Sequence, residues 1–287
     1  QLGLVAGVSL KDFGDLEGGR DVGTQDHTGY DEQDYDAKIN YNVGEHARIT
    51  LAHQSVRQDD AWRTHKTIYG IGWEGLSVGD EKDHSYDQDR DLTYLRFRAD
   101  ELNGAVDAVE MTVSRQDQTE DLYRLKKDDN SERQGFDVTT WGVALQAESD
   151  GIAGDWVYGA EYYRDDVDSY KRTYKPDGSL SKVEIQGPVA DDASYDTAGL
   201  YVEDTVHLFD GKLDVVPGAR YNYARADADK VKDPVTGEQI SVEDDWNAVV
   251  CSLSLLLTLS TDRKHVLFAG VSQGFRAPNL SDLTRLD

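Results

Sequence analysis

Arginine and aromatic side chains recur together in the polar segments of this chain. Guanidinium groups recognise carboxylates through paired hydrogen bonds, and aromatic rings stack on flat molecules such as catechols and porphyrins. Together these side chains suit an anionic, partly aromatic chelate of a metal ion. The residues that we expect to meet such a ligand, all assigned to outer loops, are Trp62, Arg63, Arg90, Tyr123, Arg124, Tyr170, Arg172 and Tyr174.

Seven histidines raise the question of a bound metal or haem. His65 lies close in sequence to Trp62 and Arg63, and an imidazole can ligate haem iron from its axial side while a neighbouring ring stacks. His65 therefore joins the candidate ligand-binding residues. His27 and His84 also fall in or beside long polar segments. The alternative for all three histidines is a solvated loop position that binds nothing.

Other motifs that would carry chemistry are missing from the sequence. Asp87, Asp89 and Asp91 imitate the start of a calcium loop, but an EF-hand requires a glycine and a carboxylate where this chain has Leu92 and Arg98. A single cysteine excludes an internal disulfide and a cysteine-rich metal site. The nucleophile-elbow, zinc-protease, P-loop and Rossmann patterns are not found. We therefore expect no enzyme activity, no metal site and no cofactor.

The charge balance limits the choice of partner. Lysine and arginine number 30 against 56 aspartate and glutamate residues, which gives a formal net charge of -26. Binding to phosphate backbones requires the opposite sign, so a nucleic-acid partner is excluded. The acidic surface is explained as solubilising, and a metal-carrying ligand stays open.

The elements that must position these residues are β-strands. Tyr35, Ala37, Ile39, Tyr41 and Val43 are apolar, whereas the residues between them are polar. Only a strand places alternate side chains on opposite faces, so each such run requires one apolar and one wet environment. No stretch approaches the roughly 18 consecutive apolar residues of a membrane helix.

Alternation predicts about a dozen strands of roughly 8–14 residues, which matches the length needed to cross a bilayer at a tilt. The predicted strands cover 2–10, 35–43, 48–58, 66–73, 92–100, 105–115, 136–148, 155–164, 195–208, 212–226, 248–260 and 265–275. Tight turns are expected at 43–47, 101–104, 149–154, 209–211 and 261–264. Long polar loops are expected at 12–34, 75–91, 116–135, 165–194 and 227–245.

Short and long connections alternate along the chain, which places all tight turns at one end of the strands and all long loops at the other. Transmembrane β-barrels have this asymmetry, and soluble sandwiches have no reason to keep it. Aromatic residues near the strand ends are typical of the girdles at membrane interfaces: Trp141, Trp156, Tyr162, Tyr201 and Tyr223. The sequence therefore predicts an all-β, transmembrane antiparallel β-barrel. A passive porin and a soluble acidic sandwich are the alternatives.

Two segments resemble a known family of membrane receptors. Residues 266–283 read VLFAGVSQGFRAPNLSDL and are similar to a strand of the TonB-dependent outer-membrane receptors, and residues 201–223 resemble a strand–turn–strand unit of the same family. Residues 61–67, AWRTHKT, are similar to a segment that some members carry early in the barrel. The motif residues that match without a gap are Gly274, Phe275, Arg276, Ala277, Pro278, Asn279 and Leu280.

The resemblance implies active uptake of an iron chelate, either a siderophore or haem, across the outer membrane of a Gram-negative-type bacterium. It slightly favours haem, and it implies the TonB protein, outer-membrane lipid and lipopolysaccharide as partners. It also implies a 22-stranded barrel with an N-terminal plug. We expect residues 1–287 to be a partial barrel domain, with the plug and the remaining strands absent, and contact with TonB to pass through the missing N-terminal part. Arg276 and Pro278 would serve architecture, with Pro278 ending a strand because it cannot donate to the ladder.

Overall fold

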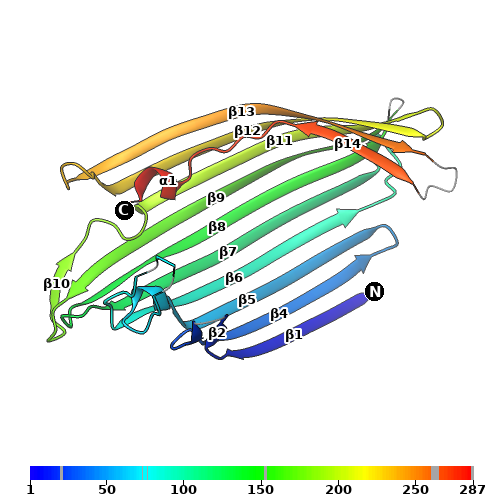
Figure 1. The fold of residues 1–287 in the computed structure, drawn as a ribbon. Helices are drawn as coiled ribbons and strands as arrows, with labels where there is room; N and C mark the ends of the chain where they lie inside the picture. Colours follow the sequence, from blue (N-terminus) through cyan, green and yellow to red (C-terminus); the bar gives the residue numbers. More distant parts are fainter. Residues whose placement is uncertain (20–21, 73, 76, 152–153, 260–264, 286–287) are drawn as a thin grey trace.

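The computed structural model describes residues 1–19, 22–72, 74–75, 77–151, 154–259 and 265–285. They form one large curved antiparallel sheet of 12 strands and a separate pair of short strands (Figure 1). The strands of the main sheet are β1 (Leu2–Phe13), β4 (Tyr30–Val43), β5 (Ala47–Trp62), β6 (Asp83–Ala99), β7 (Ala108–Leu125), β8 (Ser131–Asp150), β9 (Asp155–Tyr174), β10 (Leu180–Val183), β11 (Asp191–Leu208), β12 (Leu213–Lys232), β13 (Gln239–Thr258) and β14 (Val266–Ser272). The other elements are β2 (Leu16–Gly18), β3 (Gly23–Gln25), the 3-10 turn η1 (Thr64–Lys66) and the helix α1 (Leu280–Thr284).

The strands of the main sheet follow one another in chain order. Each pairs with its neighbours in the order β1-β4-β5-β6-β7-β8-β9-β11-β12-β13-β14, while β10 pairs with β9. The chain therefore runs up and down between two ends of the sheet. One end, at the left of Figure 1, carries β2, β10 and α1 and is called here the long-loop end. The other, with the N-terminus and short connections, is the short-turn end.

One continuous row of apolar side chains crosses the convex face of the sheet. The strand register aligns, from β1 to β13, Leu2, Tyr41, Ile49, Phe97, Met111, Leu145, Ala160, Leu200, Tyr221 and Val249. Within this row Leu2 is 72% exposed, Leu200 59% and Val249 65%. A water-soluble surface does not tolerate an apolar patch that extends across a whole sheet, whereas a bilayer requires one. This row, called here the apolar row, is the lipid-facing band of a membrane barrel.

Aromatic residues accompany the apolar row, as the sequence predicts. Trp141 is 49% exposed, Tyr162 44% and Trp156 37%. Tyr201 was assigned to the same girdle and does not belong to it. Its hydroxyl donates a hydrogen bond of 2.9 Å to Gln146 Oε1 on the opposite face of the sheet.

The concave face is polar and charged. Arg96 and Glu110 approach within 3.3 Å, Arg98 and Glu148 also within 3.3 Å, and Arg220 pairs with Glu161. The described residues contain no second main sheet stacked on this face, only the small β2–β3 pair elsewhere. A sandwich needs two apolar faces in contact, so the soluble alternative lacks its second layer.

The strands are longer than predicted, because β8, β9, β12 and β13 each have 20 residues. The sequence predicts a loop over 116–135. Instead, β7 and β8 pair without interruption from the Leu125–Ser131 pair to the Ala108–Glu148 pair. Residues 116–121 and 131–134 are polar on both faces of the sheet, so they lack the alternation that marks a strand. Backbone ladder bonds form there without it, because the neighbouring strands extend equally far.

The predicted strand at 66–73 is wrong. The chain turns through η1 at this point. Thr67 is fully buried and forms an isolated β-bridge with Glu81. A Cβ on Gly70 would lie 2.8 Å from the carbonyl oxygen of Thr64, so the backbone folds tightly on itself. Alternating apolar residues in this segment imitated a strand. Trp73 lies outside the described residues.

The tight turns expected at 43–47 and 209–211 are confirmed, whereas the turn expected at 101–104 is a longer connection over 100–107. The turn expected at 149–154 includes residues outside the described part of the chain. β4 and β5 are joined through 44–46, and β11 and β12 through 209–212. The predicted turn at 261–264 lies outside the described residues. Cys251 is exposed on the convex face opposite Ala219.

Candidate functional site

After β14 the chain leaves the sheet and crosses the concave face. Residues 273–279 are extended and lead into α1, which lies against the wall near the long-loop end (Figure 1). Asn279 caps α1 by accepting a hydrogen bond of 2.8 Å from the backbone of Asp282, and the Asp282 side chain accepts one of 3.1 Å from the backbone of Asn279. Arg276 forms an ion pair with Asp282. The motif residues thus build a capped turn of helix.

This geometry corrects the role given to Pro278. β14 ends at Ser272, so Pro278 terminates no strand. Its carbonyl oxygen instead accepts a hydrogen bond of 2.9 Å from the Tyr195 hydroxyl on β11. The motif therefore joins the end of β14 to β11, three strands away in the same sheet.

Small side chains on the wall make room for α1. Leu280, 8% exposed, packs in a buried cluster whose wall residues are Val167, Ala190, Ala193, Ala226, Ala228 and Val231. Thr284 is 3% exposed and accepts a hydrogen bond of 2.9 Å from the backbone of Ala190. Gln186 donates one of 2.8 Å to the carbonyl oxygen of Thr284. The alanine-rich wall and the segment before β11 therefore hold α1 in place.

The segment before β11 is itself pressed against β9. A Cβ on Gly187 would lie 2.5 Å from the carbonyl oxygen of Tyr170, so only glycine fits this approach. Ser169 donates a hydrogen bond of 2.6 Å to the carbonyl oxygen of Val189 and accepts one of 2.9 Å from the backbone of Gly187. This segment thus forms part of the inner wall.

Between the wall, this segment and α1 lies a cavity of about 700 Å³, called here the mouth cavity. Its lining includes five basic residues, Arg63, Arg124, Lys171, Lys232 and Arg285. Two acidic residues, Glu120 and Glu184, line it as well. A locally basic cavity in a chain of net charge -26 is a departure from the general charge of the molecule.

Buried carboxylates order the basic side chains. Glu132 is 4% exposed, and its carboxylate lies 2.9 Å from Arg124, 3.2 Å from Lys171 and 3.6 Å from Lys126. Glu81 accepts a hydrogen bond of 2.8 Å from Arg124 Nε. Because three cations share Glu132, the cluster keeps positive charge for a ligand.

Glu81 lies in the loop before β6. Burial acts to raise the pKa of its carboxyl, but hydrogen bonds with Arg124 and His84 outweigh burial and hold that pKa below its ordinary value. Glu81 therefore stays ionised beside Arg124. This fixes the guanidinium at the edge of the mouth cavity.

Arg63 is held differently from Arg124, Lys171 and Lys232, which pair with carboxylates. Its guanidinium lies over the ring of Tyr86, with 4.9 Å from Cζ to the ring centroid. Among the described residues no carboxylate forms an ion pair with Arg63. A cation presented on an aromatic face can still bind an anion from the open side.

A smaller apolar recess of about 260 Å³ adjoins the mouth cavity. Phe136, Val189 and Ser281 line both spaces. The remaining lining of the recess is largely apolar or aromatic, namely Val138, Val167, Tyr195 and Leu280, together with Asp165 and Asn279. A molecule that reached both spaces would meet cations on one side and apolar surface on the other.

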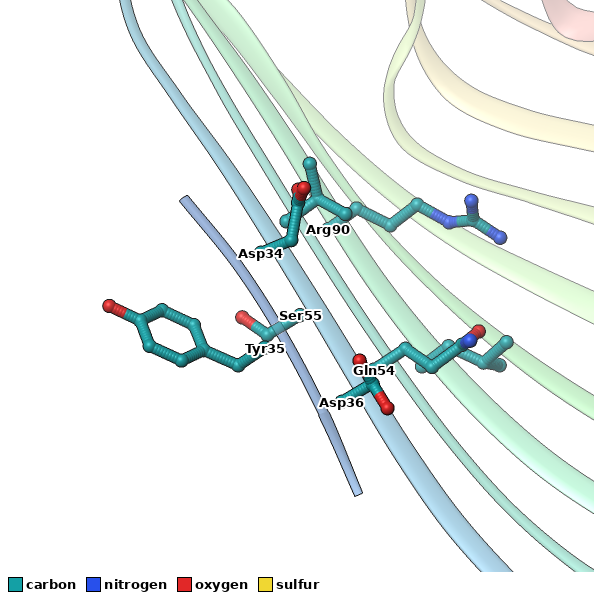
Figure 2. Close-up of a pocket in the computed structure, with 8 residues that line it drawn as sticks. Asp34, Tyr35, Asp36, Gln54, Ser55 and Arg90 are labelled. Atoms are coloured by element: carbon teal, nitrogen blue, oxygen red, sulfur yellow. The ribbon is translucent and has the colours of Figure 1, made fainter. Parts of the chain in front are cut away.

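The structure brings together only part of the predicted binding set. Arg63 and Arg124 line the mouth cavity. Arg90 points to the concave side beside Gln54 in a separate hollow of about 190 Å³ in the wall, whereas Tyr35 points to the opposite side (Figure 2). Arg90 donates a hydrogen bond of 2.9 Å to Gln116.

Four predicted residues lie in strands and face the convex side. Tyr123 is in β7, and Tyr170, Arg172 and Tyr174 are in β9. Their sequence positions share the parity of Met111 and Tyr162, which belong to the outward face. Assigning these residues to loops was wrong, as it was for Arg90 and Arg124, because the strands continue past them. Their role in ligand binding stays a prediction.

Trp62 and His65 lie at the outer end of β5 and in η1. The Trp62 ring stacks on His27 with centroids 4.7 Å apart, and Tyr69 lies 4.3 Å from the same imidazole. His65 is exposed. His84, by contrast, is 5% exposed and bonds to Glu81, so it supports the site from behind.

Sequence reasoning missed Lys171, Gln186, Lys232 and Arg285. Strand parity gives a signal for Lys171, because it lies between outward-facing neighbours in β9 and therefore points inward. Across the described residues no group of three histidine, cysteine, aspartate or glutamate side chains is arranged to hold a metal ion. The described part of the chain also has no helix long and apolar enough to cross a membrane.

Comparisons with known proteins agree with this architecture. The sequence model of the family described as TonB dependent receptor-like, beta-barrel, matches residues 6–286. No curated protein matches the sequence. The fold is similar to a solved structure titled Copper transporter OprC, with a TM-score of 0.74 and 16% identity over 96% of this chain and 42% of that protein.

Two iron-related structures are also similar. The FrpB iron transporter from Neisseria meningitidis, F3-3 variant, has a TM-score of 0.71 and 16% identity over 98% of this chain and 43% of that protein. The Serratia marcescens hemophore receptor HasR, solved with its hemophore HasA and heme, has a TM-score of 0.66 and 16% identity over 97% of this chain and 41% of that protein. At these identities the likeness is one of fold. The chain spans less than half the length of each of the three proteins.

Proposed function

Because the chain belongs to the β-barrel family of the TonB-dependent receptors, we propose that it forms part of an active uptake receptor for an iron chelate. The family consists of transporters of the Gram-negative outer membrane and not of enzymes. The ligand would be a siderophore complex or haem, and the TonB protein would supply energy from the inner membrane. As part of this proposal, residues 1–287 are a segment of a larger barrel wall that works with a plug.

The mouth cavity is the single observation that carries the proposal. It opens on the concave side at the long-loop end, and it combines basic groups with an apolar recess. Iron chelates present carboxylate or catecholate oxygens together with flat organic rings, which these two surfaces complement. The resemblance of α1 and its preceding segment to the family motif supports a receptor and not a simple pore.

The alternative of a passive porin has less support. A porin would share the apolar row and the polar concave face, so these features do not separate the two functions. The family match and the segment that leads into α1 separate them, because a narrowed and chemically specific mouth suits selective binding.

Growth on defined iron sources tests the proposed function. A strain that lacks the gene is supplied with haem or with single siderophores as its only iron source, under iron restriction. Loss of growth on one source, restored by the gene, supports the proposal and identifies the ligand. Growth identical to that of the parent strain on every source contradicts it. A strain without TonB, compared on the same source, tests energy coupling separately.

A further inference from the structure

Resting on the proposed function, we propose that the mouth cavity selects an anionic iron chelate with an aromatic or apolar portion, and recognises it by charge without ligating the metal. A bare metal ion is thereby disfavoured at this site. The proposal concerns the wall formed by β6, β7, β8, β9, β12 and α1.

The lining of the mouth cavity has more basic than acidic residues, unlike the chain as a whole. Over the whole chain 30 basic residues face 56 acidic ones, whereas five basic residues line the mouth cavity against two acidic ones. A cleft lined mostly by one sign of charge focuses the field of those groups into its interior. An anionic ligand would therefore be drawn into this cavity from an otherwise repelling surface.

The second step accounts for the carboxylates that neutralise part of this charge. Glu132 serves Arg124, Lys126 and Lys171 together, and Glu184 lies 2.6 Å from Lys182 and 3.4 Å from Lys232. Arg124 also pairs with Glu81, so three cations face two carboxylates in the first group, and two cations face one carboxylate in the second. The carboxylates preorganise the cations, so that a ligand meets donors already in position.

The third step concerns Arg63. It is exposed at the rim of the mouth cavity, and its attractive contact is with the Tyr86 ring. An arginine held by an aromatic face keeps its hydrogen-bond donors open for a carboxylate or catecholate. Arg63 is therefore the side chain from which we expect the clearest loss of anion affinity.

The fourth step is the character of the donor atoms. Histidine, cysteine and methionine are not among the residues that line the mouth cavity in the described chain. The one methionine, Met111, lies in the apolar row, and the one cysteine, Cys251, is also on the convex face. Among the described residues, soft ligands suited to copper therefore do not face this cavity.

The fifth step is the adjoining apolar recess. Phe136, Tyr195 and Leu280 offer aromatic and aliphatic surface at a place continuous with the basic lining. A ligand with charged oxygens around iron and rings at its edge can contact both spaces at once. A small inorganic anion would use only the basic part.

The experiment compares two ferric complexes that differ mainly in charge. A ferric tris-catecholate of charge about −3 and a neutral ferric tris-hydroxamate have similar size and six oxygen donors. Binding of each to the intact purified protein in detergent is followed by quenching of tryptophan fluorescence, with Cu²⁺ alone as a further probe. We expect the anionic complex to bind at least tenfold more tightly than the neutral one, with a preference that declines as salt increases.

Variants locate the effect. Arg63→Gln and Lys171→Gln should each weaken binding of the tris-catecholate about tenfold and leave the tris-hydroxamate unchanged. Arg115→Gln is the matched control, because Arg115 lies on the convex face over the Trp141 ring. Lys232→Gln replaces Lys171→Gln if the latter does not fold.

Each outcome decides the inference. Stronger binding of the anionic complex that depends on Arg63 supports it. Equal or tighter binding of the neutral complex or of Cu²⁺ overturns it, as does failure of the anionic complex to bind at all. If growth still depends on the gene for one iron source, the proposed function stands although the charge selection fails.

Discussion

The Tyr195 hydroxyl on β11 lies 2.9 Å from the carbonyl oxygen of Pro278, to which it donates a hydrogen bond across the concave face. The two residues are 83 positions apart in the sequence. This bond fixes the extended segment that follows β14 at the point where it turns into α1. The recess beside the mouth cavity is lined by Tyr195 as well, so the same side chain orders α1 and shapes the site.

Tyr195→Phe should loosen the docking of α1 without unfolding the sheet. The loss of one neutral hydrogen bond costs about 1 kcal/mol, which is small for the barrel and large for a helix of five residues. Amide hydrogen exchange at Leu283 and Arg285 should become several-fold faster. Tyr35→Phe, a substitution on the convex face, is the control. Unchanged exchange in Tyr195→Phe would show that packing alone holds α1.

Leu280→Ala tests that packing. Leu280 is 8% exposed against alanine side chains that cannot move in to fill the space. Removing its branched end should cost about 2–3 kcal/mol, enough to undock α1. Limited proteolysis should then cut within 273–285 much faster than in the parent protein, while Leu200→Ala on the lipid-facing side leaves this rate unchanged. Equal protection in Leu280→Ala would contradict the role of the buried cluster.

Glu132→Gln removes the carboxylate that three basic residues share. Arg124, Lys126 and Lys171 would then repel one another at the long-loop end, and breaking such a buried arrangement costs about 3 kcal/mol. We expect a lower temperature for the local unfolding of β7 and β8 beyond the membrane, measured by hydrogen exchange. Glu243→Gln is the control, because the Glu243 side chain is exposed and pairs with Arg225. A shift no larger than that of Glu243→Gln would mean that Glu132 does not order the cations.

The strands inside the membrane were the predictable part of the fold. In β4, the residues Tyr35, Ile39 and Tyr41 alternate with polar neighbours because lipid and water lie on opposite sides of the sheet. Beyond the membrane both faces are wet, so this signal disappears. The extensions of β7 and β8 therefore read as loops, although their backbones are fully paired.

The candidate site was predictable only in chemical type. Arginine and aromatic residues were expected, and Arg63 and Arg124 line the cavity, but Tyr170 and Arg172 face outward while Lys171 between them faces inward. Lys171 can be chosen over its two neighbours only if β9 is known to continue through it, because alternate residues of a strand face opposite sides. The sequence pattern did not show how far β9 extends. The contact of Gln186 with Thr284 joins positions 98 apart, and no local pattern encodes it.

Acid should release the loop between β5 and β6. The pKa of Glu81 is below its ordinary value in the folded protein, so its contribution to stability is complete above the unfolded pKa, near 4.3, and is lost as pH falls through the lower folded pKa. Protease cleavage within 63–72 should therefore accelerate on the acid side of about pH 4. In Glu81→Gln the cleavage rate should already be high at neutral pH and vary less with acid. An equally steep acid response in that variant would assign the transition to another group.

The apolar row allows a test of membrane placement with neighbouring residues of one strand. Val249 is 65% exposed on the convex face, and Ala248 next to it pairs with Asn222 on the concave face. Val249→Lys should destabilise the barrel in lipid vesicles by about 2–4 kcal/mol if the position is near the bilayer centre, because the ammonium group is forced into hydrocarbon. Ala248→Lys places the same charge toward water and should cost less than about 1 kcal/mol. Urea unfolding in vesicles, followed by the gel shift between folded and unfolded barrel, measures both values, and equal destabilisation of the two variants would reverse the assignment of the faces.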